Sequence, residues 1–276
     1  MEEIVPILLL PQHVEPNASN LPVLKAIQKL LNESYTATYS ARPDIFGTTH
    51  LRLADPAQLA DIIGTEGFTV ILIKASGKGL EQPSCEVVAT GSVKDFGDGD
   101  VELYAQWSDN LSAAQWAAKA QNPKSRATSK QSKKSGQKLE VSAFAVSPHY
   151  QRCGLGSRVL NEIKWLVSNI RQQETTINDA PPIEKLGLLD SSSYFKVQGI
   201  DINRLKNRVT GTETTELDQA QDGARPKLVL MAIRELGIES YYQRRGFRTV
   251  WTGTVPVGMW DCKKNCTMVY MEMDLD

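Results

Sequence analysis

Residues 139–170, LEVSAFAVSPHYQRCGLGSRVLNEIKWLVSNI, contain the pattern that decides the fold. Apolar residues up to Val146 alternate and then run together, which predicts a buried strand that Pro148 ends. Beyond the loop, five apolar residues recur at spacings of four, four, three and four, which predicts a long helix beginning between Gly154 and Gly156. These five are Leu155, Val159, Ile163, Leu166 and Ile170. Strand, glycine loop and helix therefore follow one another directly.

The overall composition is that of an ordinary folded chain. Of the 276 residues 41% are hydrophobic and 23% are charged, which excludes wholesale disorder, collagen and coiled coil. Lysines and arginines number 31 against 32 acidic residues, so the formal net charge is −1. The protein as a whole has no field that would draw it to nucleic acid or to anionic lipid, and we expect neither as a partner.

The cysteines and the N-terminal residues predict a reducing compartment. Four cysteines are too few for a disulfide framework, and three separated histidines lack metal-ligand spacing, so we expect no metal. The acidic opening MEEIVPILLLP is unlike a secretory signal, and the sequence has no apolar run of the roughly 20 residues that span a bilayer. We expect a cytoplasmic protein with no membrane partner, with the nucleus as the alternative.

The rest of the chain predicts one domain, 1–276, with two insertions. The first hundred residues read as strand, helix, helix, strand, strand. Residues 107–138 form a basic Ser/Lys/Gln tract. The favoured interpretation is a solvated insertion, and the alternative is an arm that binds an acidic partner or nucleic acid. Residues 172–225 form a second insertion, rich in polar residues and proline.

The glycine loop has the chemistry of a phosphate site. A helix N-terminus has unpaired N–H groups and a partial positive charge, and Gly154 and Gly156 let the backbone approach a ligand closely. Gln151 and Arg152 add side-chain donors. The glycines alone are equally typical of a tight connection between strand and helix.

The complete string resembles the acetyl-CoA motif of the GNAT superfamily of N-acetyltransferases, Q/R-x-x-G-x-G/A. Gln151-Arg152-Cys153-Gly154-Leu155-Gly156 matches every fixed position, and Tyr242-x-x-x-Gly246-Phe247 resembles the family's other common element. The resemblance implies an α/β (α+β) fold, a mixed and mostly antiparallel sheet of about seven strands flanked by helices. Its strands near Ala143 and Val229 would be parallel and splayed apart, so that the fourth and fifth strands form a wedge for acetyl-CoA.

The resemblance also implies which residues contact the cofactor. Backbone groups of Phe144, Ala145 and Val146 would pair with the pantetheine arm. Amides from Arg152 to Ser157 would hold the pyrophosphate. A backbone N–H near Val146, where the family's strand bulges, would stabilise the oxyanion; such a donor is typically worth roughly 3 to 4 kcal/mol.

Two residues match the family's catalytic positions. Glu140 lies where several members have a glutamate base, and Glu140, Ser142 and Phe144 are expected on one sheet face; the alternative is a solvated carboxylate. A base is useful because only about one alkylamine in a thousand or two is neutral at pH 7. Tyr242 matches the tyrosine that protonates the departing thiolate in much of the family. The alternative interpretation is that Tyr242 is an aromatic core residue at the end of a helix.

Other candidates are weaker. Cys153 could accept an acetyl group at a helix N-terminus, but it occupies a variable motif position and is interpreted as structural. Tyr35, Tyr39 and Arg42 fall where the family shapes its acceptor pocket, although ordinary packing is the favoured interpretation. The DCKKNC segment is expected to be a hairpin turn rather than a zinc site, since two further ligands are missing.

The sequence thus favours an acetyl-CoA-dependent N-acetyltransferase that transfers the acetyl group directly, in a ternary complex, to a primary amine. The amine could belong to a small molecule or to a protein. Two alternatives stay open: a protein lysine acetyltransferase that uses the basic insertion, and a non-catalytic CoA-binding sensor.

Overall fold

The computed structural model describes residues 3–49, 51–76, 84–96, 137–175 and 226–275. These residues form a seven-stranded sheet with the order β1-β2-β3-β4-β5-β7-β6. Adjacent strands are antiparallel except for β4 and β5, which are parallel. The strands are β1 Glu3–Leu9, β2 Phe68–Ser76, β3 Ser84–Phe96, β4 Lys138–Val146, β5 Lys227–Ile233, β6 Arg248–Val255 and β7 Cys266–Asp274. The predicted fold class is confirmed.

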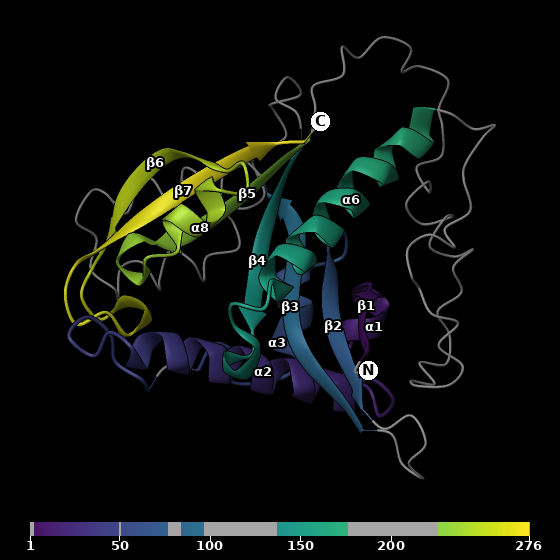
Figure 1. Ribbon diagram of the computed structural model, residues 1–276, viewed down its shortest axis with the longest axis horizontal. Helices are drawn as coiled ribbons and strands as arrows, with labels where there is room; N and C mark the ends of the chain where they lie inside the picture. The colour runs from purple at the N-terminus through teal and green to yellow at the C-terminus, as the bar shows by residue number, and fades with distance from the viewer. Residues whose placement is uncertain (1–2, 50, 77–83, 97–136, 176–225, 276) are drawn as a thin grey trace.

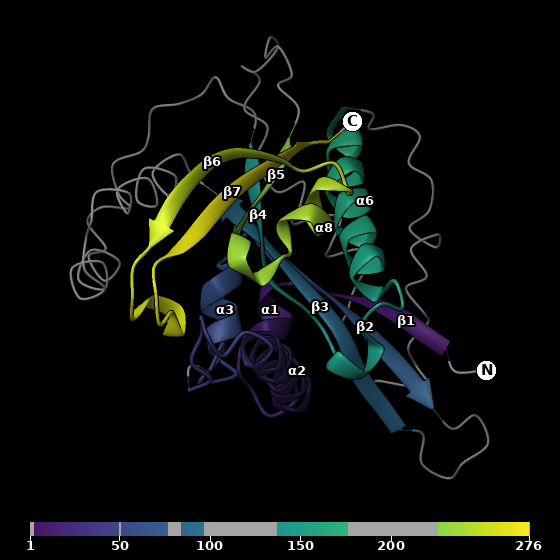
Figure 2. The same cartoon turned by 60° about the vertical axis from the view of Figure 1, so that its left-hand side comes forward.

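Helices cover both faces of the sheet. The α-helices are α1 Pro11–Val14, α2 Leu21–Ser40, α3 Gln58–Ile63, α6 Leu155–Thr175 and α8 Glu239–Gln243. Short 3-10 turns are η3 Pro148–Tyr150, η6 Arg234–Leu236 and η7 Met259–Asp261. Figures 1 and 2 show α6 and α2 on different sides of the central strands. None of the helices in these ranges is long and apolar enough to cross a membrane.

The predicted helix after the glycine loop is confirmed, and it shifts the insertion boundaries. α6 continues to Thr175, and β4 already begins at Lys138. The predicted insertions 107–138 and 172–225 therefore lose a few residues to regular structure at their edges. The rest of both lies outside the described residues.

Two apolar cores hold the helices to the sheet. On one face, α6 packs Val159, Leu160 and Ile163 against β2, β3 and β4, all three fully buried. On the other face, α2 packs Leu24, Ile27 and Leu31 against the same strands. Because each helix buries one stripe of an amphipathic pattern, the central sheet is covered on both sides.

The parallel strands separate soon after they meet. β4 pairs with β5 only from Lys138 to Glu140, opposite Lys227 to Val229. Figure 1 shows the two halves of the sheet together near the C-terminus and spread apart toward α2. The wedge predicted between the fourth and fifth strands is therefore present.

A bulge in β4 accompanies this separation. Ala143 has a φ of 43°, and the register with β3 shifts between Thr90 and Ser92, so two residues of β4 lie opposite Gly91. A Cβ at Gly91 would come within 2.9 Å of the Phe144 ring, so the bulge needs a glycine across from it. The bulge lies at Ala143, three residues before the position expected near Val146.

The bulge also changes which way the strand's side chains face. Val141 and Phe144 pack in the core under α6, whereas Ala143 and Ala145 pack under α2. Because neighbouring residues of a strand alternate, Glu140 and Ser142 face α2. The expectation that Phe144 shares their face was wrong, since one extra residue in the strand reverses the alternation.

Candidate functional site

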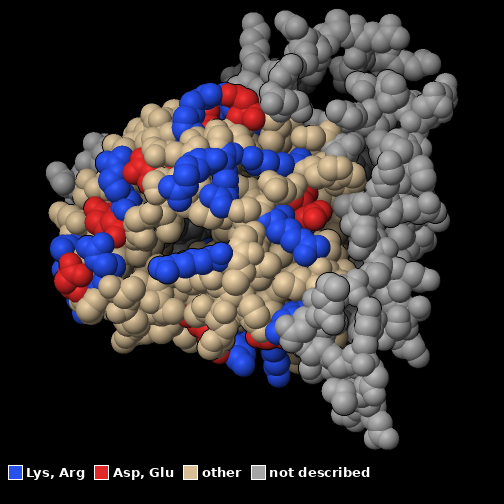
Figure 3. Space-filling model, viewed as in Figure 1, with Lys and Arg blue, Asp and Glu red and all other residues tan. Residues whose placement is uncertain are grey.

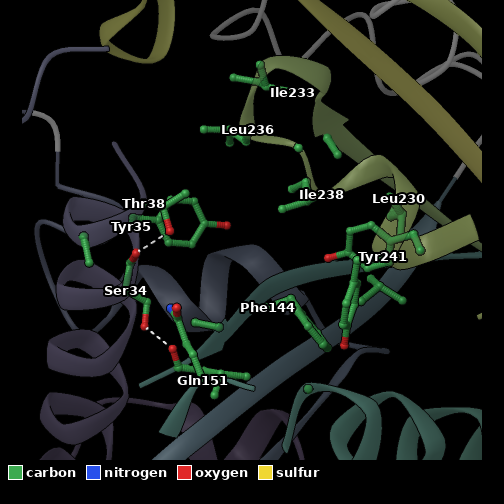
Figure 4. A pocket seen from close by; sticks show the side chains of 18 of the residues that line it. Ser34, Tyr35, Thr38, Phe144, Gln151, Leu230, Ile233, Leu236, Ile238 and Tyr241 are labelled. Carbon is green, nitrogen blue, oxygen red and sulfur yellow. Dashed lines mark hydrogen bonds between the residues drawn. The ribbon is translucent and has the colours of Figure 1, made fainter. Parts of the chain in front are cut away.

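A cavity of about 1180 Å³ lies where β4 and β5 part, and its walls come from both faces of the sheet. One wall is built by α2 and by Glu140 in β4. The other is built by the first turn of α6 and by α8, as Figure 4 shows for Tyr35 and Tyr241. Apolar residues of β5 and η6 line the part between them, among them Leu230, Ile233 and Leu236. The cavity therefore passes through the sheet.

The walls are basic. Among the described residues, five arginines line the cavity against two glutamates. They are Arg42, Arg52, Arg152, Arg244 and Arg245, with Glu140 and Glu235. Figure 3 shows a hollow on this face with basic side chains along its rims. Such a cavity favours an anionic occupant even though the whole chain is nearly neutral.

The glycine loop places unpaired amides at this cavity. Gln151 to Gly154 are exposed, and Arg152 and Gly154 have left-handed φ values of 64° and 82°. The first bond of α6 runs from the Arg158 N–H to the Gly154 carbonyl. The amides of Leu155, Gly156 and Ser157 thus have no intrahelical partner. This is the anion-binding geometry that the motif predicts.

The second glycine of the motif makes room for Tyr241. A Cβ at Gly156 would lie 2.6 Å from the Tyr241 hydroxyl. The Arg245 guanidinium lies 3.5 Å from the centre of the Tyr241 ring, donates to the Tyr241 carbonyl at 2.8 Å and bonds the Ser157 hydroxyl. Arg245 therefore ties α8 to the first turn of α6. Arg245 was not among the predicted site residues, although the sequence shows a basic residue between the tyrosine and the glycine of Tyr-x-x-x-Gly-Phe.

The end of β4 directs backbone groups into the wedge. Ser147 donates its N–H to Val88 on β3, so by antiparallel alternation Val146 turns its own N–H and carbonyl away from β3. The Ser34 hydroxyl of α2 donates to that carbonyl at 2.9 Å (Figure 4). The Val146 N–H thus faces away from β3, while the Val146 carbonyl accepts the hydrogen bond from α2. Phe144 and Ala145 also line the cavity.

Tyr242 lies in the cavity wall and is also part of the core. Its ring has edge contacts with Phe144, Tyr241 and Phe247, with centroids 5.1 to 6.1 Å apart. Burial, and in addition the nearby Tyr35 phenol, raise the pKa of Tyr242 above its ordinary value. Within the part of the chain that the structure describes, its hydroxyl makes no hydrogen bond. A protonated phenol without a protein partner suits a proton donor.

Glu140 is buried in the opposite wall, at the point where β4 last pairs with β5. The Lys94 ammonium contacts its Oε2 at 2.8 Å. The predicted alternative of a solvated carboxylate at a strand entrance was wrong, because Glu140 is 8% exposed and paired with a lysine of β3.

The α2 residues divide between cavity and core. Tyr35, Tyr39 and Arg42 all line the cavity. Tyr39 is also buried and stacks on Phe46 with centroids 4.7 Å apart, and burial raises its pKa. Arg42 donates to the Glu235 carbonyl at 2.7 Å, which joins the end of α2 to η6.

The cysteines do not form a metal site in the described ranges, where no group of three or more His, Cys, Asp or Glu side chains comes together. Cys153 is exposed in the glycine loop. Cys262 and Cys266 are buried and reduced; Cys262 follows η7 directly, and Cys266 is the first residue of β7.

Comparisons with known proteins found likeness in structure but not in sequence. No family model and no curated protein matches the chain. Among solved structures, NAA60 of Arabidopsis thaliana bound to a bisubstrate analogue is 11% identical, with a TM-score of 0.45 over 99% of this chain and 100% of that one. The ribosomal-protein-S18-alanine N-acetyltransferase of Escherichia coli is 11% identical, with a TM-score of 0.41. The match covers 100% of this chain and 95% of that one. An N-acetyltransferase of Staphylococcus aureus is 8% identical, with a TM-score of 0.40. The match covers 99% of this chain and 98% of that one.

Proposed function

We propose that this protein is an acetyl-CoA-dependent N-acetyltransferase that moves an acetyl group directly to a primary amine. The observation that carries the proposal is the cavity through the sheet, because it lets two molecules meet from opposite faces. The α6 face has a helix N-terminus and arginines, which suit a phosphorylated donor. The α2 face has the Glu140 carboxylate and two tyrosines, which suit an amine.

Acetyl-CoA supplies an activated thioester when it is bound. The amides of Arg152, Cys153, Gly154, Leu155, Gly156 and Ser157 would hold its pyrophosphate, with Gln151 and the Arg152 side chain beside them. The backbone of Phe144, Ala145 and Val146 would pair with its pantetheine arm. The Val146 N–H would face the developing oxyanion, since its direction away from β3 leaves it on the wedge side.

Two side chains would handle the protons. Glu140 would accept the amine proton through a water, in line with its place in the wall on the α2 side. Tyr242 would donate a proton to the departing thiolate, and its raised pKa keeps the phenol protonated through neutral pH. The Cys153 thiol is exposed in the glycine loop and would take no part in this direct transfer.

The test begins with binding and continues with turnover. Acetyl-CoA at about 100 times its Kd should raise the free energy of unfolding by about 2.7 kcal/mol, and desulfo-CoA should do nearly the same. Thiol release is then followed against small primary amines and lysine peptides. Release with small amines supports the proposal, and release with lysine peptides alone favours a protein acetyltransferase. Binding without release from any amine favours a sensor, and absence of stabilisation refutes the proposal.

A further inference from the structure

The α2 face of the cavity contains a guanidinium in a fixed position. Arg52 lies between α2 and α3, and the next residue, Leu53, is buried and held at both backbone groups by the Asn32 amide. These bonds are 2.8 and 2.9 Å long, and the Gln28 amide adds a third to the same carbonyl. The Arg52 guanidinium lies over the Tyr35 ring, 5.6 Å from its centre. This is a cation–π contact. A guanidinium has five N–H donors, so its contacts with Tyr35 leave others for a ligand.

The charges around Arg52 do not balance. Glu140 is the nearby carboxylate, and the Lys94 ammonium already contacts it at 2.8 Å. In the described ranges no carboxylate lies within ion-pair distance of Arg52. The group of Lys94, Glu140 and Arg52 therefore has a surplus of one positive charge. A partly buried charge is costly unless a partner neutralises it.

The other arginine of this wall is different. Arg42 lies 3.4 Å from an Asp44 carboxylate oxygen and donates a hydrogen bond to the Glu235 carbonyl. Its guanidinium is therefore already paired with protein groups. Both Glu235 oxygens in turn accept the Thr267 N–H. Arg52 is thus the cation on the α2 side that has no anionic protein partner among the described residues.

We infer that the acceptor is a small amino carboxylate, in which Arg52 binds the carboxylate and the amine points toward the gap between β4 and β5. A guanidinium suits this role because its N–H fork can bind both oxygens of a carboxylate at once. The Tyr35 ring contacts the guanidinium at a cation–π distance of 5.6 Å. Arg52 would then determine specificity while Glu140 and Tyr242 handle protons. This inference rests on the proposed acetyltransferase function.

The experiment compares each amino acid with its own amide. The probes are glycine, β-alanine and 4-aminobutyrate, which separate amine from carboxylate by one to three carbons, each with its carboxamide. Asp-Ala amide and Asn-Ala amide test whether an acidic side chain on a peptide serves instead. Thiol release at saturating acetyl-CoA gives kcat and KM for wild type, Arg52→Gln, Arg52→Lys and Arg244→Gln. Arg244→Gln is the matched control, because Arg244 lines the same cavity from the end of α8.

Wild type should have a KM for at least one free acid about 10- to 100-fold below that of its amide, the size expected for hydrogen bonds to charged groups. Arg52→Gln should raise that acid's KM until the two are equal, with kcat little changed. Arg52→Lys should retain part of the preference. Arg244→Gln should leave the ratio of acid to amide unchanged. Stabilisation of each variant by acetyl-CoA shows that it is folded and that the donor site is intact.

Equal use of acids and amides by the wild type overturns the inference and leaves the acetyltransferase function standing. If Arg52→Gln raises KM or lowers kcat by the same factor for acids and amides, the inference is also overturned. Such a result indicates that Arg52 only supports Tyr35. A preference confined to Asp-Ala amide would replace the small acid with a peptide and refute the inference as stated. Failure of acetyl-CoA to stabilise the wild type refutes the proposed function itself.

Discussion

Gly156→Ala tests why the motif ends in a glycine at this position. The added Cβ would lie 2.6 Å from the Tyr241 hydroxyl and 3.4 Å from a Val146 methyl group. The Tyr241 ring cannot move away easily, since Arg245 stacks on it at 3.5 Å and is bonded to its carbonyl. The Tyr241 hydroxyl is itself buried. The substitution therefore forces a group that is fixed on both sides to shift by several tenths of an ångström.

Two opposing terms set the size of the effect. Overpacking of a rigid site costs typically about 1 to 3 kcal/mol. Replacing a helix glycine by alanine stabilises the folded state by up to about 1 kcal/mol, because alanine has the better helix propensity. Because Tyr241 is held on both sides, overpacking near the upper part of its range, about 2 to 3 kcal/mol, is expected, and the net loss of stability should be about 1 to 2 kcal/mol. For a domain of about 150 to 250 residues this lowers Tm by roughly 2 to 8 °C.

A double-mutant cycle with Tyr241→Phe isolates the contact. Tyr241→Phe removes a buried hydroxyl that lacks a well-formed hydrogen bond, so by itself it should change stability little. In that background Gly156→Ala should become neutral or stabilising, which gives a coupling of about 1 kcal/mol or more in urea unfolding. Gly154→Ala is the control: its φ of 82° makes alanine strained, nothing lies within 4 Å, and Tyr241→Phe should not rescue it. Additivity of Gly156→Ala and Tyr241→Phe would refute this explanation of the second glycine.

Three further predictions concern the chemistry and the charges. Tyr242→Phe should lower kcat by about 10²- to 10⁴-fold in thiol-release assays while Tm stays constant, because the ring contacts remain; an unchanged kcat removes the proposed acid. Ser34→Ala should cost roughly 1 to 3 kcal/mol in urea unfolding, since it leaves a carbonyl at the end of β4 without its donor. Burial tends to raise the pKa of Glu272, but hydrogen bonds from Tyr270 and Lys138 and the charges of Lys138 and Lys227 together hold it below its usual value. Its stabilisation is complete above its unfolded-state pKa and is lost as pH falls through the lower folded value, so Glu272→Gln should flatten the decline of Tm below about pH 4.5.

Much of the fold and of the glycine-loop side of the cavity could be predicted because the signals are local. The apolar run before Pro148 and the helical spacing after Gly154 each lie within one element. They predicted β4 and α6, with the loop between them at the cavity. The amides of that loop are oriented by the start of the helix, which depends on backbone geometry more than on distant side chains.

The α2 side of the cavity could not be predicted because it depends on contacts between distant segments. Lys94 and Glu140 are cross-strand neighbours on β3 and β4, and Arg52 reaches the cavity from the connection between two helices. The bulge at Ala143 has no signal in β4 itself, since alanine seldom adopts a positive φ. Gly91 in the middle of β3 was the available signal, because an isolated strand glycine often marks a bulge or a close approach.

That bulge explains how one strand can serve two partners. Before it, β4 pairs with β5 and directs Glu140 toward α2. After it, Phe144 and Val146 face α6, while the small side chains of Ala143 and Ala145 face α2. On the α2 side, β4 therefore contributes the charged Glu140 at its last pair with β5 and only small side chains from Ser142 to Ala145. An acceptor amine entering from α2 would meet little side-chain bulk from β4 before it reached the backbone of Val146, where the donor thioester is proposed to lie.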